Sequence, residues 1–553
     1  MSTGTHDILL LPLKQNIEAV HKESLLIALA RRGIQISSDC GGMGKCGKCL
    51  VRVSQTPCKT SENADSAGFR DKQFLDQLAC QTEVTSDLTV SIPATSLSRA
   101  EVVEKPGFIS GWPGEEFTSG NRKEGFNLSL AIDIGTTTIA VYLLDHTSEI
   151  ILASGALRNP QILFGDDVMS RIHAVSLSKT HLKDMQHLVI DGINHTVSSI
   201  TDRCGADINR IDRVAVVGNP TMIHLFMGND PSSIGIYPFE PAFTDSRNVP
   251  ASDIGLNLAR DARLDVLPLV SGFLGSDIIA ATVACGLDNA KPGTMIIDIG
   301  TNGEIMVKTE AGLAATSCAT GPAFEGASIR HGMHAISGAI ESVKIDTSDS
   351  TISCSLIQQN PKKPRRAAGI CGSGIVSAVS ALLKAGVIEP SGRFNPNCVY
   401  PHLRRTNKGD VEFVLVPGNE TESGADITLT QNDIRAVQLA KGAIFTGIKL
   451  LCHELNIERP KRMLVAGAFG SHLNSEDIIT LGLFPNLEID TIEFVGNAAG
   501  KGALLSLLNE KYQRQFDAVS RQTRVVELAT HPDFQTTLIN ALSFPDVQGD
   551  WRK

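Results

Sequence analysis

The stretch Leu128-Ser-Leu-Ala-Ile-Asp133-Ile-Gly135-Thr136-Thr137-Thr138-Ile-Ala-Val-Tyr142 decides how most of this chain is organised. Its two apolar runs, separated by a short polar segment, predict a strand, a tight turn and a second strand. A glycine in the turn lets the backbone approach a phosphate closely, and threonine hydroxyls and N–H groups can hydrogen-bond phosphate oxygens. We therefore expect a phosphate-binding loop made by Gly135, Thr136, Thr137 and Thr138.

The same design recurs 165 residues later, at Met295-Ile-Ile-Asp298-Ile-Gly300-Thr301-Asn302-Gly303-Glu304. One such loop is also compatible with an ordinary hairpin turn, but two copies indicate an internal duplication. The aspartates of the two copies end their strands, where a carboxylate can hold Mg²⁺ through water. The second copy adds three predicted phosphate contacts: Gly300, Thr301 and Asn302.

A third element begins at Met463-Leu-Val-Ala, where a predicted strand runs into small residues. Small residues at this place would let an adenosine lie against the backbone. The predicted contacts are Gly467, Ala468, Phe469 and Gly470. Before this strand, Thr430 and Asp433 have the spacing of a helix N-cap and its N3 acid, and they predict the start of a long helix that contains Lys441.

A different kind of motif lies near the N-terminus, at Cys40-Gly-Gly-Met-Gly-Lys-Cys46-Gly-Lys-Cys49, with a fourth cysteine at Cys80. A [2Fe–2S] cluster needs four thiolates, and the glycines let backbone N–H groups turn toward the sulfurs. A structural zinc site usually has two paired C-x2-C elements, whereas Cys80 stands alone. The spacing therefore favours an iron–sulfur cluster held by Cys40, Cys46, Cys49 and Cys80.

Short predicted strands at 8–11, 50–53 and 88–92 surround one helix near residues 25–30. With the cysteine loop placed after the helix, this order fits a β-grasp ferredoxin. The three-cysteine spacing resembles that of the [2Fe–2S] ferredoxins. Its first gap is x5, as in the adrenodoxin-like and putidaredoxin-like proteins, and not the plant-type x4.

Length and composition limit the remaining choices. A chain of 553 residues with 42% hydrophobic and 20% charged residues is expected to form several globular domains. The net charge of −10 argues against nucleic acid as a partner. No apolar run approaches 18 residues and the start has no signal-peptide pattern. We expect no membrane association and a cytoplasmic location.

The predicted division of the chain follows these motifs. Residues 96–127 have the Pro- and Gly-rich composition of a linker. The predicted parts are a [2Fe–2S] ferredoxin-like domain (1–95), a flexible linker (96–127), ATPase lobe I (128–290), ATPase lobe II (291–510) and a C-terminal helical tail (511–553).

The two Asp-x-Gly-Thr loops and the late Val465-Ala-Gly-Ala-Phe-Gly470 segment resemble the superfamily of actin, sugar kinases and heat-shock chaperones. This resemblance implies two RNase H-like lobes that clamp ATP and Mg²⁺. It also implies that the helix containing Lys441 borders the adenine site. The expected fold is therefore α/β and multidomain: an N-terminal β-grasp [2Fe–2S] ferredoxin domain followed by a duplicated RNase H-like, actin-like ATPase.

A ferredoxin joined to such an ATPase, with Ser271-Gly-Phe-Leu-Gly-Ser-Asp277 and Ala319-Thr-Gly-Pro-Ala-Phe-Glu325, resembles the reductive activators of corrinoid-dependent methyltransferases. The resemblance implies ATP-dependent return of a corrinoid protein from cobalt(II) to cobalt(I) with one low-potential electron. It also implies an upstream reductase or ferredoxin as donor, and it is compatible with a homodimer. The residues expected to organise Mg²⁺ and the attacking water are Asp133, Asp298 and Glu304, with Glu325 as a further candidate.

Other functions remain open from the sequence. One alternative is an ATP-driven electron donor for a non-corrinoid enzyme such as a dehydratase or reductase; another is a small-molecule kinase with a redox sensor. Only 52 residues separate Cys80 from Asp133. We therefore expect no room for the additional middle domain that some corrinoid activators carry.

Overall fold

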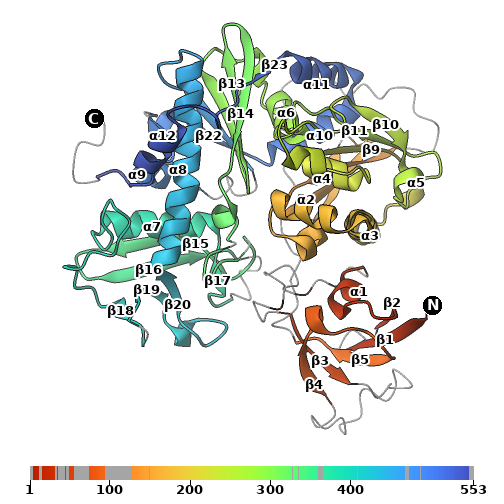
Figure 1. The fold of residues 1–553 in the computed structure, drawn as a ribbon, viewed down its shortest axis with the longest axis horizontal. Coiled ribbons are helices and arrows are strands. Elements are labelled where there is room, and N and C mark those ends of the chain that lie inside the picture. Colours follow the sequence, from red (N-terminus) through yellow and green to blue (C-terminus); the bar gives the residue numbers. More distant parts are fainter. Residues whose placement is uncertain are drawn as a thin grey trace.

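The computed structural model (Figure 1) describes residues 4–11, 15–31, 34, 36, 44, 49–54, 74–93, 127–148, 150–326, 328–333, 335–358, 365–407, 409–467, 473–485 and 487–546. Within these ranges the chain forms a small N-terminal domain and two larger lobes. No described helix combines the length and apolarity needed to cross a membrane.

The N-terminal domain is a five-stranded mixed sheet packed on one helix, as the sequence predicts for a β-grasp fold. The strand order is β2-β1-β5-β3-β4, with β1 and β5 parallel. Leu25, Leu26 and Leu29 of the helix are buried against alternating residues of the strands. The elements are β1 (Thr5–Leu11), β2 (Gln15–Val20), α1 (Leu25–Arg31), β3 (Leu50–Ser54), β4 (Leu75–Leu78) and β5 (Leu88–Ser91).

Lobe I is built on a six-stranded sheet of order β10-β11-β9-β6-β7-β8. The predicted strand–turn–strand around Asp133 is the antiparallel pair β6–β7, and β6 also pairs in parallel with β9. The elements are β6 (Leu128–Ile134), β7 (Thr138–Asp145), β8 (Ile150–Arg158), the 3-10 turn η5 (Pro160–Phe164), α2 (Val168–Leu177), α3 (Lys179–Cys204), β9 (Ile211–Gly218), α4 (Pro220–Phe226), β10 (Arg247–Pro250), α5 (Ala251–Ile254), β11 (Arg263–Val266) and α6 (Ser276–Ala284).

Lobe II repeats the central part of this topology with the order β22-β21-β12-β13-β14-β23, in which the edge strand β23 (Thr523–Val525) has no counterpart in lobe I. The antiparallel pair β12–β13 carries the second Asp-x-Gly-Thr loop, and β12 pairs in parallel with β21 just as β6 pairs with β9. The two equivalent sheets confirm the internal duplication that the sequence indicates. The repeated elements are β12 (Thr294–Ile299), β13 (Gly303–Thr309), β14 (Gly312–Cys318), β21 (Arg462–Ala466), α9 (Ser475–Leu481), β22 (Ile492–Gly496) and α10 (Ala498–Leu508).

Between β14 and β21 the chain forms an insert of two three-stranded sheets, followed by the long helix α8. Thr430 and Asp433 form the predicted capping box at the start of α8. The elements are β15 (Ala339–Asp346), β16 (Thr351–Leu356), β17 (Gly369–Ile370), α7 (Gly372–Lys384), β18 (Leu403–Arg405), β19 (Val411–Val416), β20 (Ile427–Thr430) and α8 (Gln431–Glu454).

Helices α6 and α10 lie between the two sheets and give both lobes a common core (Figure 1). The faces of β6, β7 and β9 that meet these helices carry the small side chains of Ala131, Ala140 and Ala215. The helices themselves approach closely, since a Cβ at Gly502 would lie 2.3 Å from the Ala280 carbonyl oxygen. Small residues therefore bring the two sheets together around one helix pair.

The chain after residue 510 differs from the helical tail that the sequence predicts. It contains α11 (Glu510–Gln522), the short strand β23 (Thr523–Val525) and α12 (Phe534–Ala541). Strand β23 extends the sheet of lobe II by pairing in parallel with β14, and Phe516 of α11 is fully buried in the common core. Because the apolar residues of α11 are few and widely spaced, the segment begins like a polar appendage in the sequence, although it is an integral part of lobe II.

Candidate nucleotide cleft and cluster site

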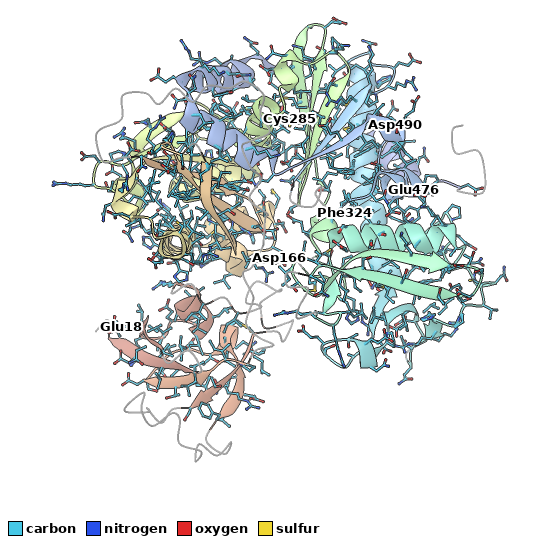
Figure 2. The ribbon with its side chains drawn as sticks, turned by 180° about the vertical axis from the view of Figure 1, so that it is seen from behind. Glu18, Asp166, Cys285, Phe324, Glu476 and Asp490 are labelled. Carbon is cyan, nitrogen blue, oxygen red and sulfur yellow. The ribbon has the colours of Figure 1, made fainter. Side chains whose placement is uncertain are left out.

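A cleft of about 190 Å³ lies between the two lobes. Both Asp-x-Gly-Thr loops line it, so residues 165 positions apart in the sequence face the same space. Phe324, which also lines the cleft, marks this region in Figure 2. The predicted site residues found in the lining are Asp133, Gly135, Thr136, Thr137, Thr138, Asp298, Gly300, Thr301, Asn302, Glu304, Glu325 and Gly467.

The first loop is a tight turn closed by a hydrogen bond from the Gly135 N–H to the Thr138 carbonyl, at 3.0 Å. A Cβ at Gly135 would lie 2.6 Å from that carbonyl oxygen, so the turn needs glycine. The Thr136 hydroxyl accepts a hydrogen bond from Asn219 Nδ2 at 2.9 Å. The turn hydrogen bond and Asn219, at the N-terminus of α4, thus both support the conformation of the loop.

The second loop is one residue shorter than the first and has a more acidic surrounding. Its Gly300 N–H donates to the Asn302 carbonyl at 3.0 Å. Asp298 lies directly opposite Glu304 across the β12–β13 pair, whereas the corresponding partner of Asp133 in lobe I is Ala140. The duplication therefore has two similar phosphate loops and one additional carboxylate, on the lobe II side.

Glu325 connects the two loops. The carboxylate oxygen Oε2 accepts hydrogen bonds from the Thr137 hydroxyl at 2.9 Å and from the Thr301 hydroxyl at 2.5 Å. Glu325 ends the 3-10 turn η9 (Pro322–Glu325), and Gly326 follows with a φ of +80°. A single carboxylate thus contacts the hydroxyls of both lobes at the position where the loops meet.

The carboxylates of the cleft are strongly affected by burial. Desolvation, together with the charges of Asp277 and Glu325, raises the pKa of Asp298 to about 7, and desolvation raises the pKa of Asp277 to about 6. Burial also raises the pKa of Glu304 well above its usual value and raises that of Glu325. Buried carboxylates of this kind are neutralised by a proton or by a cation, and oxygen-only donors are the ligands that Mg²⁺ prefers. The donor set therefore fits Mg²⁺ bound with a nucleotide.

Gly467 shows how closely the third predicted element approaches the second loop. Its φ is +100°, and a Cβ there would lie 2.8 Å from both Asp298 Oδ1 and the Ile299 carbonyl oxygen. The predicted contacts Ala468, Phe469 and Gly470 lie outside the described residues. Of the predicted adenosine contacts, only Gly467 can be placed, and it lies in the cleft.

Lys441 is not brought to the described lining of the cleft. Its Nζ donates to the Ser543 carbonyl at 2.7 Å, and the side chain is buried against the C-terminal segment. Burial lowers the pKa of Lys441 to about 8. The predicted contact with the nucleotide is not supported by this geometry, because the amine is oriented toward the end of the chain.

Sequence reasoning missed two asparagines that hold the cleft. Asn219 caps α4 and donates to Thr136, and Asn497 caps α10 and donates to Asp133 Oδ2 at 3.0 Å. Each follows a strand in a Val-Gly-Asn tripeptide, at 217–219 and 495–497. This repeated tripeptide is a second mark of the duplication and could have identified both residues. In the sequence, Asp277, at the start of α6, is recognisable only as the last residue of the segment 271–277.

In the N-terminal domain the described cysteines fit a common metal site. Cys49 Sγ and Cys80 Sγ lie 3.3 Å apart, although the two cysteines are far apart in sequence and form no disulfide. Gly44 has a φ of +71°, and a Cβ there would meet Gln81 Nε2 at 2.1 Å, so Gly44 lies directly against the residue that follows Cys80. Cys40 and Cys46 lie outside the described residues. Two adjacent thiols beside a glycine loop fit ligation of an iron–sulfur cluster.

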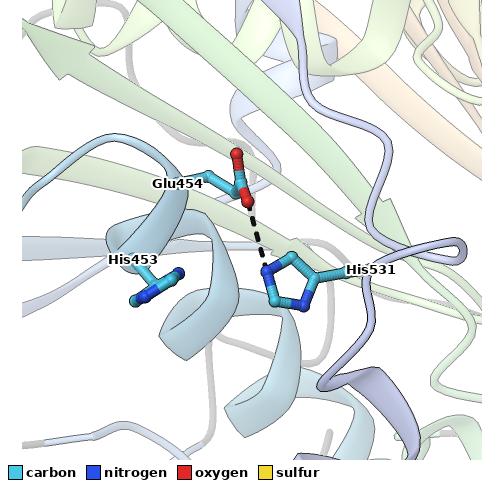
Figure 3. A group of neighbouring side chains, drawn as sticks. All are labelled: His453, Glu454 and His531. Atoms are coloured by element: carbon cyan, nitrogen blue, oxygen red, sulfur yellow. Dashed lines mark ion pairs between the residues drawn. The ribbon is translucent and has the colours of Figure 1, made fainter.

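A second cluster of possible metal ligands joins the end of α8 to the segment before α12 (Figure 3). His531 Nε2 lies 3.2 Å from Glu454 Oε1, and His453 lies beside them. However, His531 Nδ1 accepts the Asp533 N–H at 3.1 Å, which in the neutral ring leaves the proton on Nε2. The Nε2 atom therefore donates to Glu454. This contact ties the segment before α12 to the end of α8, and it does not favour a metal site.

Comparisons with known proteins agree with this geometry. Three family models match in succession: a 2Fe-2S iron-sulfur cluster binding domain at residues 9–85, the RACo middle region at 128–290, and the C-terminal, ASKHA domain of RACo at 293–552. The corrinoid activation enzyme RamQ of Eubacterium limosum is 31% identical over 97% of this chain and 99% of its own length. This chain belongs to the RACo family.

Two further proteins are similar to this chain. A solved structure, a reductive activator for a corrinoid, iron-sulfur protein, has 29% sequence identity and a TM-score of 0.71, with 98% of each chain covered. A Methanosarcina barkeri reductase for a Co(II) methylated amine-specific corrinoid protein is 27% identical over 67% of this chain and 68% of its own length. The fold class and the family resemblance predicted from the sequence are thus confirmed.

The RACo comparison corrects one expectation. The short spacing between Cys80 and Asp133 led us to expect that a middle domain is missing, but the model of the RACo middle region matches residues 128–290. In the structure these residues form lobe I, from β6 to α6. The middle region therefore needs no space of its own between the linker and the first Asp-x-Gly-Thr loop.

Proposed function

We propose that this chain reactivates a corrinoid protein of a methyltransferase system by ATP-dependent reduction of its cobalt from cobalt(II) to cobalt(I). The observation that carries the proposal is the cleft, where both phosphate loops and a group of buried carboxylates meet in a chain that also has a ferredoxin-like domain. The named relatives that cover most of the chain act on corrinoid proteins or are called corrinoid activators. They favour this function over activation of a dehydratase.

The residues of the cleft suggest how ATP and Mg²⁺ are held. The hydroxyls of Thr136, Thr137 and Thr301 and the N–H groups of both loops would hold the phosphates, and Asp133 and Asp298 would hold Mg²⁺, which neutralises phosphate charge. Glu325 touches both loops and is the carboxylate best placed to orient a water for ATP hydrolysis. Glu304 would act indirectly, through Asp298, which lies opposite it across the β12–β13 pair.

The chemistry explains why a cluster and an ATPase share one chain. A [2Fe–2S] centre held by Cys40, Cys46, Cys49 and Cys80 would supply one electron, and plant-type centres lie near −400 mV. Each 59 mV uphill costs a factor of ten in equilibrium for a one-electron step. A change between two lobe arrangements, driven by ATP, can shift the population of a bound corrinoid partner toward a form that accepts the electron.

We propose the division 1–95, 96–127, 128–290 and 291 onward, with the segment 511–553 included in lobe II. An upstream reductase or ferredoxin would reduce the cluster, and a cytoplasmic location suits such donors. A homodimer is compatible with the family resemblance.

The test is an anoxic assay with a purified cobalt(II) corrinoid protein, in which the cobalt(I) absorbance is followed with and without ATP. We expect an ATP-dependent rise that is lost in Cys46→Ala and in Asp298→Asn. Asp490→Asn makes the same chemical change at an exposed position (Figure 2) and should behave as the wild type. Cobalt(II) that persists with several corrinoid partners while ATP is hydrolysed would contradict the proposal and favour a different electron acceptor.

A further inference from the structure

The ferredoxin-like domain contacts η5 and α3 of lobe I. Leu163 of η5 is half-buried and packs against the apolar core of that domain. Arg31 of α1 pairs with Glu23 of its own domain at 3.1 Å through Nη1, and its Nη2 lies 3.9 Å from Oδ1 of Asp184 of α3. Figure 1 shows α1 next to α3. In Figure 2 the position of η5 can be found from the labelled Asp166, which follows η5 in the sequence. An apolar contact and a charge pair thus form one docking surface, made by η5 and α3.

The beginning of η5 also holds the first phosphate loop. Asn159 is the N-cap of η5, and its Oδ1 accepts the Gln161 N–H at 3.0 Å. Its Nδ2 donates to the Gly135 carbonyl at 2.8 Å, and its backbone N–H donates to the Thr137 carbonyl at 2.8 Å. One buried asparagine therefore fixes η5 and two carbonyls of the loop at the same time.

The end of η5 is tied to the same loop by Arg171. This fully buried guanidinium donates from Nη2 to the Thr136 carbonyl at 2.7 Å and from Nε to the Gly165 carbonyl at 3.0 Å. Burial lowers the pKa of Arg171 to about 10, so the group stays charged at neutral pH. The carbonyls of Gly135, Thr136 and Thr137 are thus all bound by residues that also hold η5.

From these contacts we propose that the η5–α3 surface is the docking site of the chain's own ferredoxin-like domain, and that docking there is coupled to nucleotide binding at the first phosphate loop. Contact with Leu163 orders η5, and an ordered η5 preorganises the loop for phosphate. Because coupling between two binding events is reciprocal, the nucleotide strengthens docking to the same extent. The proposal rests on the proposed ATP binding and adds where the cluster domain is held while ATP is bound.

The experiment uses the full cluster-containing chain under anoxic conditions. ATP affinity is measured by calorimetry with Mg²⁺, and hydrogen exchange of the α1 amides is measured with and without ATP. Leu163→Asp removes the apolar contact, and Asp184→Lys places a positive charge opposite Arg31 without changing the core of either domain. Leu177→Asp is the matched control, because Leu177 ends α2 in the same lobe and is 69% exposed.

We expect ATP to slow α1 exchange in the wild type and in Leu177→Asp. In Leu163→Asp and Asp184→Lys this effect should disappear, and ATP affinity should fall by about fivefold or more. If Leu163→Asp fails to fold, Asp184→Lys decides. Normal ATP binding with no change in α1 exchange in the wild type, and equal affinities in all variants, would overturn the coupling and leave the proposed function intact. Failure of the wild type to bind ATP would overturn both.

Discussion

Gly467 is the residue at which a single added carbon atom should do the most harm to the cleft. A Cβ there would meet Asp298 Oδ1 and the Ile299 carbonyl oxygen, both at 2.8 Å, and the φ of +100° disfavours any other residue. We expect Gly467→Ala to weaken ATP binding at least tenfold, because the collision displaces the second loop and its aspartate. Equilibrium binding of ATP in the presence of Mg²⁺ measures the effect.

A second glycine provides a control that distinguishes the effect of this collision from the effect of backbone strain alone. Gly386 has a similar left-handed φ of +68°, and a Cβ there would meet no atom within 4 Å. Gly386→Ala should therefore cost only about 1–2 kcal/mol of stability from the strained backbone and leave ATP affinity unchanged. Equal ATP affinities of the two variants would show that Gly467 does not shape the site.

The burial of Lys441 should make the free energy of unfolding depend on pH. Burial lowers its pKa in the folded chain to about 8, whereas an unfolded lysine titrates near 10.4. Between these values the unfolded chain binds more protons, so the free energy of unfolding rises as the pH rises through this window. Below about pH 8 the destabilising charge is fully present.

The measurement is the difference in unfolding free energy between the wild type and Lys441→Met at pH 7 and pH 10. From pH 7 to pH 10 the free energy of unfolding of the wild type should rise by about 2 kcal/mol relative to that of the variant, since each pKa unit corresponds to roughly 1.4 kcal/mol. A difference that stays constant from pH 7 to pH 10 would show that the amine is not buried as described.

The sequence predicts some residues of the cleft well and others poorly. The threonines and aspartates of the two loops are recognisable because their side chains carry the chemistry themselves. Asn159 and Arg171 act through the backbone carbonyls of a loop that precedes them by 20 residues or more. Nothing in the local pattern marks such a partner, because the contact exists only after β7 and β8 have folded back.

Among the elements, α11 has a role that its polar sequence hides. Only three of its residues, Tyr512, Phe516 and Val519, are buried, and they lie on one face of the helix against the core that both lobes share. We expect Phe516→Ala to lower the free energy of unfolding by about 3 kcal/mol or more, the usual effect of removing a buried phenylalanine. Ile539→Ala, at a 66% exposed position of α12, is the control.

Chemical denaturation followed by circular dichroism can measure this difference. An effect of Phe516→Ala as small as that of Ile539→Ala would show that α11 is an appendage, as the sequence suggests. Periodicity correctly predicts the strands around both loops, since their apolar runs are long. It does not predict β23, because three residues that join the edge of an existing sheet carry no pattern of their own.

For the whole molecule, the sequence predicts the combination of domains better than their arrangement. The cysteine spacing and the repeated loops indicate a ferredoxin and a duplicated ATPase, and the fold and the RACo family membership confirm both. The contact of α1 with α3 joins surfaces of two different domains, and no pattern in either stretch of sequence marks such a partner. It nevertheless places the cluster-bearing domain against the element that holds the first phosphate loop.

The central claim is that ATP drives one electron from this chain to a corrinoid cobalt. The most direct measurement is anoxic, freeze-quenched electron paramagnetic resonance on the reduced chain mixed with a cobalt(II) corrinoid protein. The proposed reactivation predicts that the signals of the reduced cluster and of cobalt(II) disappear together, one for one, after ATP is added, and that both persist without ATP. Loss of the cobalt(II) signal while the cluster stays reduced, or equal loss without ATP, would contradict it.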